Sequence, residues 1–186
     1  MKKFTAFISL VLFMTGIYSQ TIEKLDEKNG FKDFKLGDTY SKWQNQLSAV
    51  GYWEDGTRKY LYTGNCCTNV FNYPIDMIKL RFSDNKLVGI YIKTKKFQKG
   101  FAETGIYTKF RTSDYERINS SLTYLFGEPT QYIDPVGVMG VEFLWIGKKV
   151  LLTSRYECCS TKSGGDFQRI SIVDLSFLNN GNEEGF

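Results

Sequence analysis

Two segments of the chain have the pattern of an amphipathic helix followed by short strands, and this repeated order most constrains the fold. Residues 38–51 place apolar side chains at positions 40, 43, 47 and 50, with Asp38 or Thr39 able to begin a helix and Gly51 able to end it. Residues 113–126 carry an equivalent stripe, each position 75 residues later, and begin with a Ser113 and Glu116 capping box. Both segments are therefore predicted to be helices.

Each predicted helix precedes three segments with the composition and alternation of β-strands. The predicted strands are residues 59–63, 78–82 and 87–93 in the first half and 141–146, 150–156 and 169–175 in the second. This order predicts an α+β fold of two degenerate units, each a helix plus three strands, at about residues 31–100 and 106–178. We expect one domain over residues 20–186, with an antiparallel sheet and the helices packed on one face.

The cysteines form two adjacent pairs, Cys66-Cys67 and Cys158-Cys159, which lie 92 residues apart, the same distance as Ile78 from Ile170. In an exported chain, four cysteines indicate two disulfides. The bridges could be vicinal, within each pair, or could join the two units. We favour the joining arrangement because closing a long loop constrains the unfolded chain more than closing a minimal ring. The spacing does not match a zinc site, so no metal ligand is predicted.

The first nineteen residues have the pattern of a cleaved signal peptide: a cationic start followed by a mostly apolar run over residues 4–18. Residue 20 would begin the mature chain. Because no cysteine precedes Cys66, no lipid-modified cysteine can form at that end. We expect an exported protein, periplasmic or secreted, that is not lipidated and does not insert into the membrane after cleavage.

The composition argues against several classes of function. The formal net charge is +4, of which Lys2 and Lys3 supply two, so nucleic acid is not an expected partner. The chain contains no histidine, the commonest general base and metal ligand. No catalytic residue, metal or cofactor is predicted, and we expect a protein that is not an enzyme. A pair of carboxylates suited to glycoside hydrolysis would not be visible in sequence.

Aromatic side chains are the remaining lead. Trp43 lies on the first helical stripe and Trp145 in a strand, so both are expected in the core. Other aromatic residues lie in or beside predicted loops and strand ends, where exposed rings can anchor a partner. These candidate binding residues are Trp53, Tyr60, Tyr62, Tyr73 and Tyr132.

Two short motifs carry a resemblance to a known group. Phe34-Lys35-Leu36-Gly37-Asp38-Thr39 leads into the first helix, and Leu125-Phe126-Gly127-Glu128-Pro129-Thr130 ends the second. This order resembles the β-lactamase-inhibitor-protein-like superfamily, which includes small outer-membrane assembly lipoproteins of the SmpA/OmlA type. The resemblance implies an envelope or secreted binding module with helices on an antiparallel sheet. The chain departs from the lipoproteins in lacking a lipidated cysteine.

Two functions follow as hypotheses. The first is an exported binding module that recognises another protein, of the inhibitor, immunity or envelope-assembly type. The second is a carboxylate-based hydrolase or a carbohydrate-binding domain that acts on envelope or extracellular glycans. An apolar patch on the open face of the sheet would favour the first hypothesis, and a cleft lined by carboxylates would favour the second.

Overall fold

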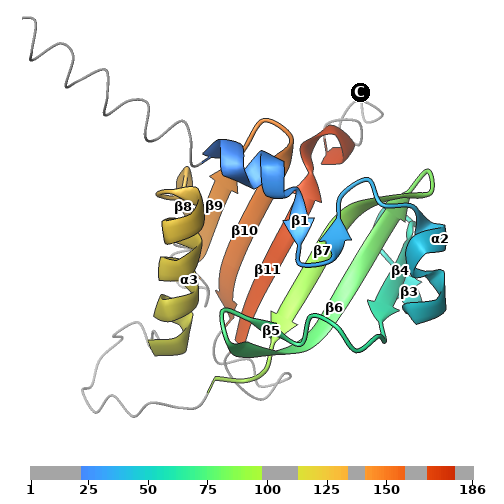
Figure 1. The fold of residues 1–186 in the computed structure, drawn as a ribbon, viewed down its shortest axis with the longest axis horizontal. Coiled ribbons are helices and arrows are strands. Elements are labelled where there is room, and N and C mark those ends of the chain that lie inside the picture. The colour runs from blue at the N-terminus through green and yellow to red at the C-terminus, as the bar shows by residue number, and fades with distance from the viewer. Residues whose placement is uncertain (1–21, 98–112, 134–140, 158–166, 179–186) are drawn as a thin grey trace, which may run out of the picture.

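The computed structural model describes residues 22–97, 113–133, 141–157 and 167–178 (Figure 1). These residues form the predicted α+β fold with an antiparallel sheet, and the helices are few. The sheet runs in the order β3 (Leu47–Tyr52), β4 (Arg58–Tyr62), β6 (Tyr73–Ser83), β7 (Lys86–Thr94), β11 (Phe167–Asp174), β10 (Val150–Glu157), β9 (Glu142–Ile146) and β8 (Gln131–Ile133), with β5 (Asn69–Val70) paired to β6.

The strand order contains two antiparallel meanders that meet at the pair β7–β11 in the middle of the sheet. All six predicted strands are present. Each meander has four strands along the sheet rather than the expected three, because residues 47–52 and 131–133 add the edge strands β3 and β8. The register of the central pair sets Ile170 opposite Ile92 and Ser171 opposite Tyr91.

Alternation along the central strands separates two faces of the sheet. On one face, which we call the core face, Leu80, Ile90, Ile92, Leu152 and Ile170 are at most 2 % exposed. The residues between them, such as Lys79, Tyr91 and Arg169, point to the opposite side, which we call the outer face. A single register therefore decides the chemistry of both faces.

Helix α3 (Ser113–Phe126) has the predicted bounds, and the predicted stripe is buried except at Leu125, which is half-buried. Tyr115, Ile118 and Leu122 belong to the main apolar core. Gly127 follows the helix with φ 81°, and its N–H donates to the Thr123 carbonyl, which closes the last turn. Figure 1 shows α3 packed beside β9 and β10.

The first predicted helix is wrong over most of its length. Only α2 (Tyr40–Trp43) and the 3-10 turn η1 (Gln44–Gln46) are helical, and residues 47–52 form edge strand β3 instead. Pairing with β4 gives this segment backbone partners that outweigh a weak helical preference. Val50 is consequently 46 % exposed, although the helical pattern predicted it to be buried.

The cysteine spacing also fails to align equivalent strands. It sets Ile78 in β6 against Ile170 in β11, although β6 is the third main strand of its meander and β11 the last. Cys66-Cys67 follows β4 in the chain, whereas Cys158-Cys159 follows β10. The two pairs therefore occupy different places in the order of strands.

Residues 22–28 form an additional helix, which the sequence analysis did not predict. Asp26 fixes this helix to the β9–β10 turn by accepting hydrogen bonds from the backbone N–H groups of Lys148, Lys149 and Val150 at 2.7, 2.9 and 3.0 Å. A Cβ atom at Gly147 would lie 2.5 Å from the Asp26 carboxylate, so any larger residue here would have to displace that side chain.

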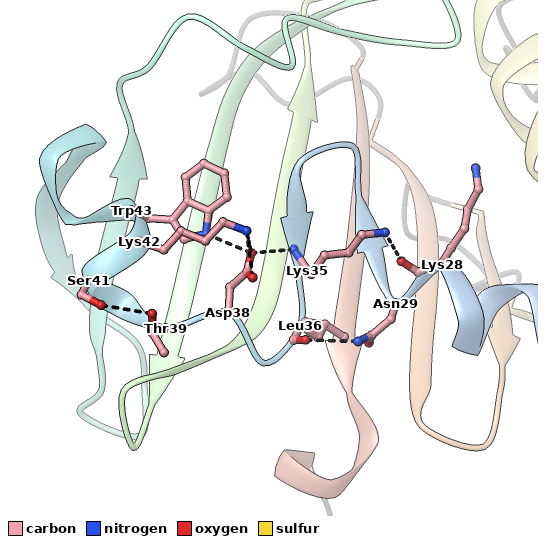
Figure 2. A network of polar contacts seen from close by, with 9 residues as sticks. All are labelled: Lys28, Asn29, Lys35, Leu36, Asp38, Thr39, Ser41, Lys42 and Trp43. Carbon is pink, nitrogen blue, oxygen red and sulfur yellow. Dashed lines mark hydrogen bonds and ion pairs between the residues drawn. The ribbon is translucent and has the colours of Figure 1, made fainter.

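A short hairpin, β1 (Gly30–Phe31) with β2 (Phe34–Lys35), follows the helix of residues 22–28 and is held by the contacts drawn in Figure 2. Asp38 accepts hydrogen bonds from the Lys35 N–H at 3.0 Å, the Trp43 indole at 3.1 Å and the Lys42 ammonium at 2.9 Å. Burial raises the pKa of Asp38, but these hydrogen bonds outweigh it and hold that pKa below its usual value. Asp38 thus joins the hairpin to α2, and Thr39, the other residue predicted as a possible N-cap, occupies the N-cap position.

A small polar network lies between α3 and the core face. The Asn119 side-chain oxygen accepts from Ser154 at 2.6 Å and from Gln168 at 3.2 Å. The Gln168 N–H donates to Thr94 at 2.9 Å, and Ser154, Gln168 and Thr94 are fully buried. Because one amide atom of Asn119 and one of Gln168 lack a partner among the described residues, the network is only partly satisfied.

The predicted signal peptide and Cys158-Cys159 lie outside the described residues. Within the described part of the chain, no helix has both the length and the apolar character needed to cross a membrane.

Candidate binding cleft on the outer face of the sheet

A cleft of about 320 Å³ lies on the outer face of the sheet, between the turn before β4 and the central strands. We call it the cation–aromatic cleft. Its lining is formed mainly by three aromatic residues and four basic residues: Trp53, Tyr91 and Phe167 with Lys59, Lys79, Lys93 and Arg169.

The register of the sheet places these side chains together. Lys79 lies opposite Tyr91, and Lys93 lies opposite both Met77 and Arg169. Because each of these residues alternates with a buried neighbour on the core face, it has to point to the outer face. The basic residues are distributed over β4, β6, β7 and β11, so they form a cluster only when the strands pair in this order.

The aromatic rings support the basic side chains. The Trp53 ring packs on Tyr91 at 4.5 Å between centroids, and the Lys59 ammonium lies 4.4 Å from the Trp53 ring centre. Gly89 permits this arrangement, because a Cβ atom there would lie 2.8 Å from the Tyr91 ring. The Trp53 indole N–H is buried without a hydrogen-bond partner among the described residues.

A second aromatic ring holds two further cations on the same face. The Lys93 ammonium lies 4.6 Å from the centre of Phe167, and the Arg169 guanidinium lies 5.4 Å from it. Phe167 itself is only 1 % exposed. The aromatic residues of the cleft therefore position positive charge and present little free ring surface of their own.

Carboxylates neutralise part of this charge. Asp76 accepts from Lys93 at 3.0 Å, Glu157 accepts from Arg169 at 2.6 Å, and Asp55 pairs with Arg81 beside the cleft. Among the described residues, Lys59 and Lys79 have no carboxylate partner within ion-pair distance. The cleft therefore keeps an excess of positive charge, centred on these two lysines.

The Lys79 ammonium lies in surroundings that disfavour its charge. Burial lowers the pKa of Lys79, and the positive charges of Lys59, Arg169 and Lys93 lower it further. Both causes penalise the charged ammonium. A carboxylate placed in the cleft would offset both, so the site is electrostatically suited to an anionic ligand.

The predicted aromatic residues do not form one surface. Trp53 lines the cation–aromatic cleft, whereas Tyr60 packs against Tyr40 at 5.2 Å. Tyr62 packs on Phe34 at 4.9 Å in the core. The other two are Tyr73, which is 8 % exposed and donates to the Lys96 carbonyl, and Tyr132, which is 45 % exposed on edge strand β8.

Sequence reasoning did not find the basic members of the cleft. Lys93 ends the predicted strand of residues 87–93, but the sequence analysis did not single it out as a candidate binding residue. The alternation in residues 77–81 and 91–93 was the available signal, since it sets Lys79 and Lys93 on the side opposite to the buried isoleucines. That signal identifies one face but does not show which strands pair.

Cys66 and Cys67 are both free thiols in the structure, so the vicinal bridge, the less favoured of the two alternatives, is not present between them. A bridge from either one to Cys158 or Cys159 stays a prediction. The two sulfurs and the Asp33 carboxylate lie within 4.8 Å of one another, an arrangement that could hold a metal ion. Burial, with the hydrogen bond to Cys66, raises the pKa of the Cys67 thiol to about 12, which disfavours the thiolate that a metal would require.

Comparison of the chain with protein-family models, with curated proteins and with solved structures found no significant match.

Proposed function

We propose that the protein is an exported binding module that recognises an acidic surface of another protein through the cation–aromatic cleft. The observation that carries the proposal is the pair Lys59 and Lys79, two basic residues in a cleft without carboxylate partners among the described residues. A partner carboxylate would remove the charge repulsion and replace the hydration that burial of Lys79 has removed.

The fold supports a binding role of the kind that the resemblance implies. We infer that the two meanders are related units, because each begins after a helical segment and the last strands of both pair at the centre of the sheet. The cysteine spacing does not contribute to this inference, since it aligns strands of different order. Such an arrangement gives a continuous face that spans both units, and the cleft lies across their junction.

The glycan hypothesis has less support from this face. Sugar rings bind by stacking on exposed aromatic faces, but Trp53 is occupied by Tyr91 and Lys59, and Phe167 is buried beneath Lys93 and Arg169. The carboxylates at the cleft are engaged in ion pairs, which removes the free acid and base that glycoside hydrolysis requires. We therefore propose recognition of a protein partner as the function.

The experiment compares partner capture by three purified forms of the protein. These are the wild type, the cleft variant Lys59→Gln/Lys79→Gln and the control variant Lys148→Gln/Lys149→Gln, which changes the same charge at exposed positions of the β9–β10 turn. Envelope and supernatant fractions are passed over each form, and bound proteins are quantified at low and high salt. We expect a protein that is retained by the wild type and the control, lost from the cleft variant and released by salt.

Equal capture by all three forms would overturn the proposal, as would the absence of any specifically retained protein. A panel of envelope and extracellular glycans provides the second arm. Binding or turnover of a glycan that is lost in the cleft variant would favour the alternative function.

A further inference from the structure

A second cavity lies on the opposite side of the sheet and is separate from the cation–aromatic cleft. It has a volume of about 310 Å³ and is bounded by the core face, α3, the helix of residues 22–28 and the β1–β2 hairpin. Figure 1 shows these elements around the same region of the sheet. Its size is at the lower end for small-molecule sites, so it fits a slender ligand.

The walls of this cavity are apolar, and its charged residues all have one sign. Leu122, Leu125 and Phe126 of α3 face Leu152 and Ile170 of the sheet across it. The charged residues that line it are lysines of the segment 28–35, namely Lys28, Lys32 and Lys35, and no carboxylate is among its lining residues in the described part of the chain.

These lysines keep their positive charge available. The Lys35 ammonium donates to the backbone carbonyl of Lys28 at 2.6 Å, and Lys32 donates to the Asn69 side chain at 2.9 Å. Both acceptors are neutral. Figure 2 shows Lys28 with no contact drawn to its ammonium. The ion pairs among the described residues include none of the three lysines.

The frame of the cavity is fixed before any ligand binds. Asp26 ties the helix of residues 22–28 to the β9–β10 turn through three backbone N–H groups, and Asp38 ties the hairpin to α2. An apolar cavity in such a frame does not collapse easily. The side chains that line the cavity lack packing partners, which costs free energy. An apolar ligand that fills the cavity would supply those contacts.

We propose that this cavity binds a free fatty acid, with the hydrocarbon chain between α3 and the core face and the carboxylate at the lysines of segment 28–35. An apolar wall recognises the chain, and an uncompensated cationic rim recognises the single negative charge. This inference goes beyond the proposed function and does not depend on it, because the two sites lie on opposite faces of the sheet.

The first test is calorimetric titration of the delipidated full protein with dodecanoate and with dodecanol, below their aggregation limits. We expect one dodecanoate per chain, with a dissociation constant on the order of micromolar, and about tenfold weaker binding of the alcohol. Failure of dodecanoate to bind, or equal affinity for the alcohol, would overturn the proposal. Binding to anionic phospholipid vesicles with none to monomeric dodecanoate would likewise overturn it and indicate a lipid surface.

The second test uses matched variants. Leu125→Trp fills the cavity from α3 and is expected to weaken dodecanoate binding about tenfold or more, whereas Tyr124→Trp adds the same side chain at an 87 % exposed neighbour and should leave it unchanged. Leu125→Phe provides a smaller filling change if the tryptophan variant does not fold. Unchanged binding in a folded filling variant would contradict the assigned cavity.

A charge pair of variants tests the carboxylate position. In Lys28→Gln/Lys35→Gln, dodecanoate and dodecanol should bind with about equal affinity. The control Lys24→Gln changes a lysine on the helix of residues 22–28 that does not line the cavity, and it should preserve the preference for dodecanoate. A preference that survives in the double variant would exclude Lys28 and Lys35 as the carboxylate site.

Discussion

The two faces of the sheet come from the same strands and have opposite chemistry. The core face is closed by α3 and contains side chains such as Trp145, which is fully buried. The outer face holds basic residues beside aromatic rings, and Lys59, Lys79 and Lys93 are half-buried there. Stability therefore depends mainly on the core face, and the charge that could bind a partner lies on the outer face. Substitutions should consequently affect stability and binding separately.

The largest expected difference is between two tryptophans. Trp145→Ala removes a fully buried ring and the hydrogen bond from its indole to the Gly127 carbonyl, and should lower the free energy of unfolding by about 3–5 kcal/mol. Trp53→Ala on the outer face should lower it by about 1 kcal/mol while weakening partner capture. Urea unfolding of both variants checks this. Similar losses of stability would break the distinction between the faces.

The next largest difference is between neighbours on β10. Ser154→Ala removes one member of the buried polar network and leaves Asn119 and Gln168 with one partner fewer, at a cost of about 1–3 kcal/mol. Thr153→Ala, one residue earlier on the outer face, should change stability by less than about 0.5 kcal/mol. Chemical denaturation of the two single variants provides the measurement. A larger effect at Thr153 would contradict the assigned faces.

Alkaline pH should lower the free energy of unfolding through Cys67, which belongs to the apolar core. The pKa of this thiol is raised to about 12 in the folded protein, from its ordinary value of 9.0, so the folded state binds more protons than the unfolded state between these values. The contribution to stability is complete below pH 9 and is lost as pH rises toward about 12.

Denaturation of the reduced protein across this range should show stability falling with pH, and the slope should decrease in Cys67→Ala. Tyr62→Phe is the companion variant, because burial and the hydrogen bond to Cys66 raise the pKa of Tyr62 to about 12 as well. A slope that neither substitution changes would show that other groups control this range.

The smallest expected effect is at Lys79, and its sign is opposite. Burial lowers the pKa of this ammonium in the folded protein. Between that lowered pKa and the ordinary pKa of lysine, the unfolded state therefore binds more protons than the folded state. The destabilisation by this group is consequently relieved as pH rises through the folded pKa. Lys79→Met should therefore stabilise the protein at neutral pH, by about 0.5 kcal/mol or less. Thermal unfolding measures this change. A destabilised variant would show that Lys79 supports the fold rather than a ligand.

The spacing of apolar residues along the chain predicted the helix and strands whose formation depends on neighbouring residues in the sequence. The stripe and stop signal of α3 gave its bounds, and alternation gave all six predicted strands. The same reasoning was wrong for residues 47–52, whose backbone finds partners on β4, far along the chain. It also placed Tyr73 among the candidate binding residues, although this ring is buried, because burial of a loop-flanking ring depends on what packs over it.

The sequence by itself determined the α+β class, the second helix, and which residues along each central strand share a face, because these follow from the periods of helix and strand. The tertiary structure alone decided that β7 pairs with β11, which brings Lys79 and Lys93 beside Arg169 in one cleft. It also decided that α3 and the hairpin enclose an apolar cavity. Both sites consist of residues that are distant in sequence. The strand pairing that brings these residues together is stable only when the whole sheet assembles.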